Sequence, residues 1–225
     1  MSLSDRFSPR TAPAQPEHGS PGWVVIVPVK STEIGKSRLT DAAPDRAVLA
    51  RALALDTISA AAAATAVERV IVVSEDPDIA AAVRRMRGVE VVREGDSRGL
   101  DAAIATGAAA AGPDSPRAAL LGDLPALRPF DLDTALEAAE AVERGVVADA
   151  EGEGSTLVTA RAGATWISAF GEDSFSRHKL LGCTPLDVPA DSTLRRDVDT
   201  AEQLAAASAL GLGERTAAVL ASSAA

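Results

Sequence analysis

The sequence predicts one α/β domain built on a mostly parallel sheet with helices packed against it. Short, continuous apolar runs, typical of strands buried on both faces, alternate with segments whose apolar residues recur at helical spacing. The composition agrees, since 47% of the 225 residues are hydrophobic and 24% are charged, which are ordinary values for a globular domain. A chain of this length can bury a substantial core.

The first predicted strand is the apolar run 23–29, and the domain is expected over residues 23–225. Residues 1–22 contain four prolines among serines, glycines and charged residues, which predicts a disordered tail. Further strands are predicted at 69–73, 89–92 and 118–121, with shorter strand-like pieces at 146–149 and 156–160. Helices are predicted at about 44–64, from Asp76-Pro77 to Met86, at 99–111, at 132–142, and from the capping box Thr200–Gln203 to Gly211, the last element.

The charge balance argues against several classes of partner. The net charge is −10, so a surface for nucleic acid or for an anionic membrane is not expected. The lone Cys183 excludes an internal disulfide and a cysteine zinc site. No apolar run is long enough to span a membrane, and no secretory signal core is present, so a cytoplasmic protein is expected.

Lysines gather in the loop after the first strand. The chain has three lysines, and Lys30 and Lys36 lie in this loop beside Arg38. Compact cationic charges collected there suggest a role in binding phosphates, although a solvated surface loop is the simpler alternative. The segment ends like a P-loop, but Lys30 stands where that motif requires glycine, so the match is weak.

Three aspartates later in the chain are candidate metal ligands. Asp123 comes directly after a predicted strand, where ligands bind in open α/β sheets. Asp197 and Asp199 are two residues apart, so in an extended stretch both side chains point the same way and could share a metal site with Asp123. Turn and helix capping are the simpler alternatives for all three.

Glycines and hydroxyl residues mark a further polar region in the second half of the chain. In segments 152–156 and 170–178 the glycine amides could approach an anion, and the serine hydroxyls could add donors. Ordinary turn chemistry, with Asp173 or Ser174 as a helix N-cap, is the alternative. The chain has only two histidines, His18 and His178, so a histidine metal site or a histidine-based triad is hard to assemble.

Taken together, these motifs resemble one family over about residues 23–220. Pro-Val-Lys at 28–30, Lys-Ser-Arg-Leu at 36–39, Leu-Gly-Asp-Leu-Pro-Ala-Leu at 121–127, Phe-Gly-Glu-Asp-Ser-Phe-Ser-Arg-His at 170–178 and Arg-Asp-Val-Asp-Thr at 196–200 are similar to the phosphoenolpyruvate / 2-phospholactate guanylyltransferases. That family makes a precursor of the deazaflavin coenzyme F(420), and it is related to molybdenum-cofactor guanylyltransferase. The resemblance implies a Rossmann-like nucleotidyltransferase fold with a mixed sheet sandwiched by helices.

The resemblance also implies roles for particular residues. Metal ligands are expected at Asp123, Asp197 and Asp199, and contacts to the phosphorylated acid at Ser155, Gly171 and Ser174. Catalytic cations are expected at Lys30, Lys36 and Arg38, and nucleotide contacts at Lys36, Gly99, Asp101 and Gly122. Asp101 stands where the family usually carries asparagine, and an ionised carboxylate only accepts hydrogen bonds.

The implied reaction joins GTP and phosphoenolpyruvate with release of pyrophosphate. One or two Mg²⁺ ions are expected, with Mn²⁺ as a substitute, and the implied partners are a second copy in a homodimer and a downstream deazaflavin transferase. The high alanine and arginine content suggests a GC-rich bacterial host, for which the family favours phosphoenolpyruvate over 2-phospholactate or 3-phosphoglycerate. A P-loop-like kinase and a non-catalytic nucleotide-binding module remain alternatives, whereas a dehydrogenase is disfavoured because no strand precedes Gly-x-Gly-x-x-Gly.

Overall fold

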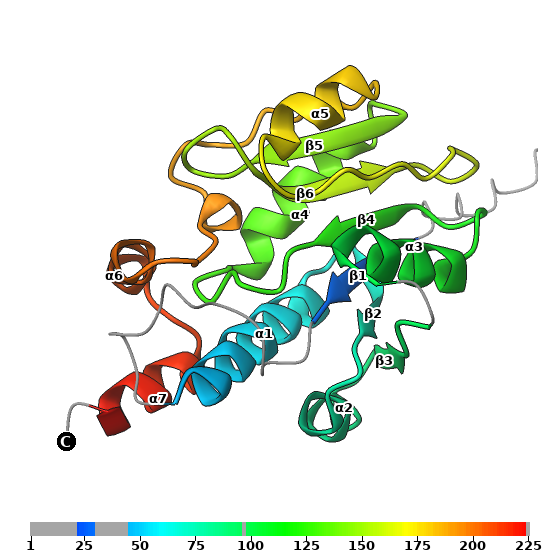
Figure 1. Cartoon of the computed structure of the whole chain (residues 1–225). Coiled ribbons are helices and arrows are strands. Elements are labelled where there is room, and N and C mark those ends of the chain that lie inside the picture. The colour runs from blue at the N-terminus through cyan, green and yellow to red at the C-terminus, as the bar shows by residue number, and fades with distance from the viewer. Residues whose placement is uncertain (1–21, 30–44, 96–97, 224–225) are drawn as a thin grey trace, which may run out of the picture.

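The computed structural model of the chain describes residues 22–29, 45–95 and 98–223 (Figure 1). The expected tail, apart from Gly22, lies outside these residues, as does the loop that carries Lys30, Lys36 and Arg38. Of the described helices, none is long and apolar enough to cross a membrane.

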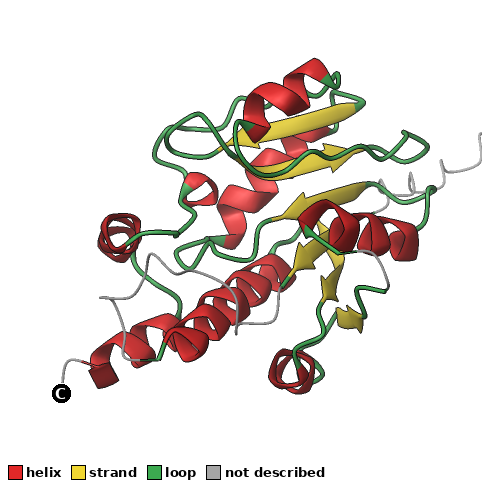
Figure 2. Ribbon diagram, viewed as in Figure 1, coloured by secondary structure: helices red, strands yellow, loops and turns green. Residues whose placement is uncertain are grey.

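The described residues form a seven-stranded sheet with the strand order β3-β2-β1-β4-β6-β5-β7 (Figure 2). Its strands are β1 (Trp23–Pro28), β2 (Val67–Val73), β3 (Val89–Val92), β4 (Arg117–Leu120), β5 (Arg144–Ala148), β6 (Ser155–Ala160) and β7 (Thr184–Pro185). All neighbouring pairs are parallel except those of β6, which runs antiparallel to both β4 and β5. The sheet is therefore mixed and mostly parallel, as predicted. The carboxyl ends of β1, β4 and β5 share one edge with the beginning of β6.

Helices cover both faces of this sheet. On one face lie α1 (Arg46–Ala63), α2 (Pro77–Val83) and α4 (Pro129–Ala139), and on the other lie α3 (Leu100–Ala111) and α5 (Ser174–Leu180). Val25 and Val27 of β1 pack on the first face, and Val24 and Ile26 pack on the second. Because successive strand residues point to opposite faces, a strand covered on both sides is apolar throughout, which explains the continuous runs in the sequence.

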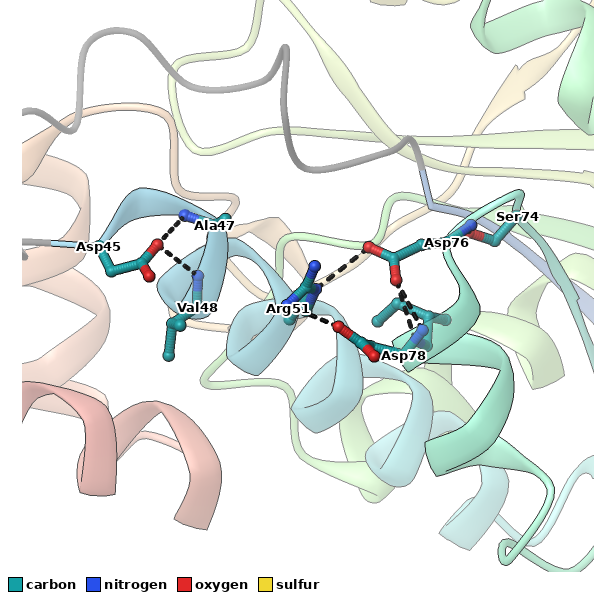
Figure 3. A network of polar contacts seen from close by, with 8 residues as sticks. Asp45, Ala47, Val48, Arg51, Ser74, Asp76 and Asp78 are labelled. Carbon is teal, nitrogen blue, oxygen red and sulfur yellow. Dashed lines mark hydrogen bonds and ion pairs between the residues drawn. The ribbon is translucent and has the colours of Figure 1, made fainter.

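A polar network fixes the beginning of α2 against α1 (Figure 3). Asp76 accepts hydrogen bonds from the amides of Asp78 and Ile79, so it caps the helix as predicted, with Pro77 as the first helical residue. Arg51 of α1 pairs with Asp76 at 3.1 Å and with Asp78 at 2.9 Å. Although burial acts in the opposite direction, these hydrogen bonds and the guanidinium charge hold the pKa of the Asp76 carboxyl below its usual value.

The predicted capping box is present, but the helix that it begins is not the last element. Thr200 accepts from the amide of Gln203, whose side chain binds the Thr200 amide, and α6 (Ala201–Leu210) ends at Gly211. A further helix, α7 (Glu214–Ser223), follows, and Figure 1 shows it alongside α1.

The residue that caps α7 lies in α1 and not in the segment just before the helix. Asp56 accepts hydrogen bonds from the amides of Arg215 at 3.2 Å and Thr216 at 2.8 Å. Gly213 precedes the helix and brings no capping side chain of its own. The start of α7 therefore carries no local sequence signal, which is the physical reason that the prediction ended at Gly211.

Candidate active site

A pocket of about 860 Å³ opens at the edge where β1, β4 and β5 end and β6 begins. Segments far apart in the sequence contribute to it: the end of β1, one face of α1, the turn after β4, the β5–β6 loop, the loop before α5 and the segment before α6. Its described lining consists of Pro28, Val29, Ala50, Ala54, Leu100, Leu121, Gly122, Asp123, Asp149, Glu153, Gly154, Ser155, Phe170, Gly171, Glu172, Asp173, Ser174, Asp197 and Asp199. The three predicted metal ligands, the three predicted acid-binding residues and Gly122 thus share one cavity.

Backbone hydrogen bonds bring the aspartates of two distant segments together. In the turn after β4, the Leu124 amide donates to the Thr57 hydroxyl of α1 at 3.0 Å, which fixes the turn against a buried helix. The Val198 amide donates to the carbonyl oxygen of Asp123 at 3.0 Å. Because Asp197 and Asp199 flank Val198, this bond places the predicted aspartate pair beside Asp123.

Asp197 is the most strongly perturbed of these carboxyl groups. Burial, followed by the nearby charges of Asp123, Asp149 and Asp199, raises the pKa of Asp197 to about 8. Its buried Oδ1 has no hydrogen-bond partner among the described residues. A divalent cation with oxygen ligands fits this arrangement, because it would neutralise the crowded carboxylates and ligate the buried oxygen.

Two carboxylates near Asp197 were not predicted. Single ligand atoms of Asp149, Glu151 and Asp197 lie within 4.8 Å of one another. Asp149 directly follows β5, so it occupies the same kind of strand-end position that singled out Asp123. Asp149 was not predicted as a site residue because residues 146–149 were assigned to a strand as a whole.

The glycine-rich turn between β5 and β6 binds a carboxylate of the chain itself. Asp149 accepts hydrogen bonds from the amides of Gly152 at 2.6 Å, Glu153 at 3.0 Å and Gly154 at 2.6 Å. A Cβ atom at Gly154 would lie 2.3 Å from Oδ2 of Asp149, so any larger residue there would displace the carboxylate from these amides. The amides that the sequence suggested for an external anion hold Asp149 instead, and they fix the loop that leads into Ser155.

The predicted acid-binding residues line the pocket from two sides. Ser155 begins β6 and Ser174 begins α5, and each is only 2% exposed. Gly171 has φ +112°, a conformation that L side chains rarely adopt, and its carbonyl oxygen accepts from the Ser174 amide at 3.1 Å. Asp173 occupies the N-cap position with φ 53° but makes no side-chain capping bond, so the capping alternative is not realised by its carboxylate.

Asp101 is turned toward the loop before α5. Its Oδ1 accepts a hydrogen bond from the Phe170 amide at 3.1 Å. Within the described lining, Leu100 reaches the pocket, whereas Gly99 and Asp101 do not. A group that only accepts hydrogen bonds suits this position, because its partner is an amide N–H. The nucleotide contacts of Gly99 and Asp101 stay predictions.

Solved structures of proteins described as nucleotide-transferring share this arrangement of strands and helices. A protein from Desulfovibrio desulfuricans G20, assigned as a nucleotide-diphospho-sugar transferase, superposes with a TM-score of 0.65 at 17% identity, covering 89% of this chain and 97% of that one. A nucleotidyl transferase from Methanothermobacter has a TM-score of 0.58 at 19% identity, covering 85% and 98%. The fold is therefore the Rossmann-like nucleotidyltransferase fold, as expected.

The sequence comparison narrows this class to one family. The chain belongs to the family described as guanylyl transferase CofC like, which matches residues 23–211. The phosphoenolpyruvate guanylyltransferase of Streptomyces scabiei is 47% identical over 208 residues, covering 88% of this chain and 96% of that protein. The resemblance inferred from the motifs is confirmed.

Proposed function

We propose that this protein joins GTP and phosphoenolpyruvate to give enolpyruvyl-diphospho-guanosine and pyrophosphate, a step in coenzyme F(420) biosynthesis. The observation that carries the proposal is the pocket shared by Asp123, Asp197 and Asp199 with Ser155, Gly171 and Ser174. A relative named phosphoenolpyruvate guanylyltransferase that is 47% identical to the chain supports the same substrates. The product would then pass to a downstream deazaflavin transferase.

The proposed reaction is an attack of a phosphate oxygen of phosphoenolpyruvate on the α-phosphorus of GTP. A bond forms between that oxygen and the α-phosphorus, the bond to the bridging oxygen of the β-phosphate breaks, and pyrophosphate leaves. A phosphate monoester is largely ionised at neutral pH, so no strong general base is required. The chemical problem is to bring two polyanions together in line, and this is a matter of positioning and charge.

Asp123, Asp197 and Asp199 would hold Mg²⁺ at the edge of the sheet. When bound, the cation would supply charge neutralisation and Lewis-acid polarisation of phosphoryl oxygens. Burial and the neighbouring carboxylates raise the pKa of Asp197 to about 8, and a bound cation would offset both effects by stabilising the ionised carboxylates. Asp149 would act mainly on the loop before β6, because its carboxylate already accepts three amide hydrogen bonds.

Ser155, Gly171 and Ser174 would orient the phosphorylated acid opposite the aspartates. Two nearly buried hydroxyls and the amide of a glycine can together donate to a phosphate or a carboxylate. Lys30, Lys36 and Arg38 would neutralise the triphosphate, and these three residues lie outside the described part of the chain. Gly122, which lines the pocket, would lie against the nucleotide.

Incubation with MgCl₂, GTP and one phosphorylated acid at a time tests the proposed function. We expect stoichiometric pyrophosphate and a product of the mass of enolpyruvyl-diphospho-guanosine, with phosphoenolpyruvate preferred over 2-phospholactate and 3-phosphoglycerate. GDP formation would indicate a kinase, and binding without turnover would indicate a nucleotide-binding module. Either result would overturn the proposal.

Ser174→Ala tests the division of the pocket between the two substrates. Loss of a hydroxyl that bonds a charged group typically costs roughly 1.5–3 kcal/mol, or about ten- to a hundredfold. We expect the KM for phosphoenolpyruvate to rise by about this factor while the KM for GTP changes little. Ser176→Ala is the matched control, since Ser176 lies on the same helix but is exposed. An equal loss for both substrates would assign residues 171–178 to the nucleotide.

A further inference from the structure

His178 lies directly behind the acid-binding side of the pocket. It is in α5, its side chain is wholly buried, and its ring meets that of Phe170 edge-on with the centroids 4.9 Å apart. The ring contacts both segments that form this side of the pocket: the beginning of β6 at Ser155, and the loop before α5 at Ala169 and Phe170.

The hydrogen bonds of the ring determine its tautomer. The Ala169 amide can only donate, and it lies 2.9 Å from Nε2 of His178, so Nε2 must be the unprotonated acceptor. In a neutral ring the proton is then on Nδ1, which is 3.0 Å from Oγ of Ser155. The ring therefore donates to the serine, and the serine oxygen is the acceptor in this bond.

The surroundings keep this ring neutral under ordinary conditions. Burial lowers the pKa of His178 to about 4, and the charge of Arg177 acts in the same direction. Asp101 and the backbone of Ser174 raise it by smaller amounts. At neutral pH the ring consequently has one N–H and one lone pair.

Ser155 accepts this bond with one lone pair of its oxygen, so its own hydroxyl proton is left to be donated elsewhere. Its side chain is 2% exposed and lines the pocket. We propose that His178 is a positioning residue that makes the Ser155 hydroxyl a hydrogen-bond donor aimed at the phosphorylated acid. The inference rests on the proposed function, because it takes the ligand of Ser155 to be the anionic acceptor substrate.

The second ring nitrogen offers a competing, purely structural explanation. Through Nε2 the ring holds the Ala169 amide, and the adjacent Phe170 is also fixed by Asp101 at its amide and by Arg177 at its carbonyl oxygen, the latter at 2.7 Å. If His178 served only this loop, its bond to Ser155 would be incidental. Because the two roles use different nitrogen atoms, substitutions can separate them.

Substitution of His178 by asparagine or by glutamine keeps one of its two hydrogen bonds and removes the other. The amide of His178→Asn lies near the position of Nδ1 and can donate to Ser155, whereas His178→Gln reaches toward Nε2 and can accept from the Ala169 amide. We expect His178→Asn to keep the KM for phosphoenolpyruvate within about threefold of wild type. We expect His178→Gln to raise it about ten- to a hundredfold, because a bond to a charged ligand is misdirected. The KM for GTP should stay within about twofold in both variants.

Ser155→Ala completes the design as a double-mutant cycle. If His178 acts through Ser155, adding His178→Gln to Ser155→Ala should change the KM for phosphoenolpyruvate by less than about threefold. Additive losses would overturn the proposal. The reverse order, with His178→Gln close to wild type and His178→Asn impaired, would establish the loop-holding role instead.

The tautomer can be observed without any variant at the site. His18→Ala leaves His178 as the single histidine of the chain, so ¹⁵N-histidine labelling gives one imidazole signal pair. We expect a protonated Nδ1 and an unprotonated Nε2 at pH 7, and protonation of Nε2 at that pH would overturn the proposal. If the wild type makes no pyrophosphate from GTP and phosphoenolpyruvate, the proposed function fails, while this measurement still decides the state of the ring.

Discussion

Replacing Asp197 with asparagine should stabilise the protein when no divalent cation is present. The pKa of Asp197 is raised from 3.8 to about 8 by burial and by neighbouring carboxylates. One pKa unit corresponds to about 1.4 kcal/mol. With allowance for the solvent around the partly exposed carboxylates, we expect Asp197→Asn to raise the free energy of unfolding by roughly 1–3 kcal/mol at pH 8.

The sign of the pH dependence follows from the direction of the shift. Between about pH 4 and pH 8 the folded protein keeps a proton on Asp197 that the unfolded chain has released. Wild-type stability therefore falls as the pH rises through this window, whereas the asparagine variant has no such loss. The advantage of the variant should be small at pH 5 and largest at pH 8.

Denaturation in EDTA at pH 5 and pH 8 measures this difference, and a second series in MgCl₂ measures the effect of the cation. We expect Mg²⁺ to stabilise the wild type at pH 8 and to have much less effect on Asp197→Asn. Asp191→Asn is the matched control, since it removes the same charge from an exposed position outside the pocket lining. An advantage of Asp197→Asn that is equal at pH 5 and pH 8, or equal to that of Asp191→Asn, would show that the pKa of Asp197 is not raised in this way.

Three further substitutions test how the structure supports the site. Gly154→Ala should lower the free energy of unfolding by roughly 1–3 kcal/mol, because its Cβ would lie 2.3 Å from the Asp149 carboxylate. Denaturation and a KM measurement for phosphoenolpyruvate check this, and wild-type values for both would contradict it. Asp56→Ala should cost about 1–2 kcal/mol and speed hydrogen exchange in α7, whose first amides it caps; unchanged exchange there would show that α7 needs no such cap. Arg51→Ala should lower the free energy of unfolding by less than about 1 kcal/mol, since Asp76 still caps α2 and the pairing arginine is partly exposed. A much larger loss in denaturant would mean that the network of Figure 3 stabilises more than the beginning of α2.

Much of the fold could be predicted because buried segments are recognisable by their apolar residues. Strands covered by helices on both faces must be apolar at every position, and β1 and β2 are recognisable for that reason. Helix starts with a local cap, such as Asp76-Pro77 and Thr200–Gln203, were also predicted correctly. The start of α7 was missed, because its capping group comes from Asp56, about 160 positions earlier in the chain.

In the candidate site, contacts between residues far apart in the sequence were even harder to predict. The strand-end rule pointed to Asp123, and the two-residue spacing of Asp197 and Asp199 suggested that they share its site; all three do line one pocket. The sequence did not show that the glycine amides of the β5–β6 loop bind Asp149. A glycine-rich segment indicates that backbone amides are accessible, but it does not identify the group to which they donate. The proton position on His178 is likewise fixed by a tertiary contact, the Ala169 amide.

In the proposed function, the aspartates of this pocket serve guanylyl transfer to a phosphorylated acid. The most direct test is product analysis by mass spectrometry of reactions with GTP, phosphoenolpyruvate and MgCl₂, run in parallel for the wild type and Asp123→Asn. We predict one pyrophosphate for each enolpyruvyl-diphospho-guanosine formed by the wild type, and loss of most turnover in a variant that remains folded. Formation of GDP by the wild type, or near-wild-type turnover by Asp123→Asn at saturating Mg²⁺, would contradict the claim.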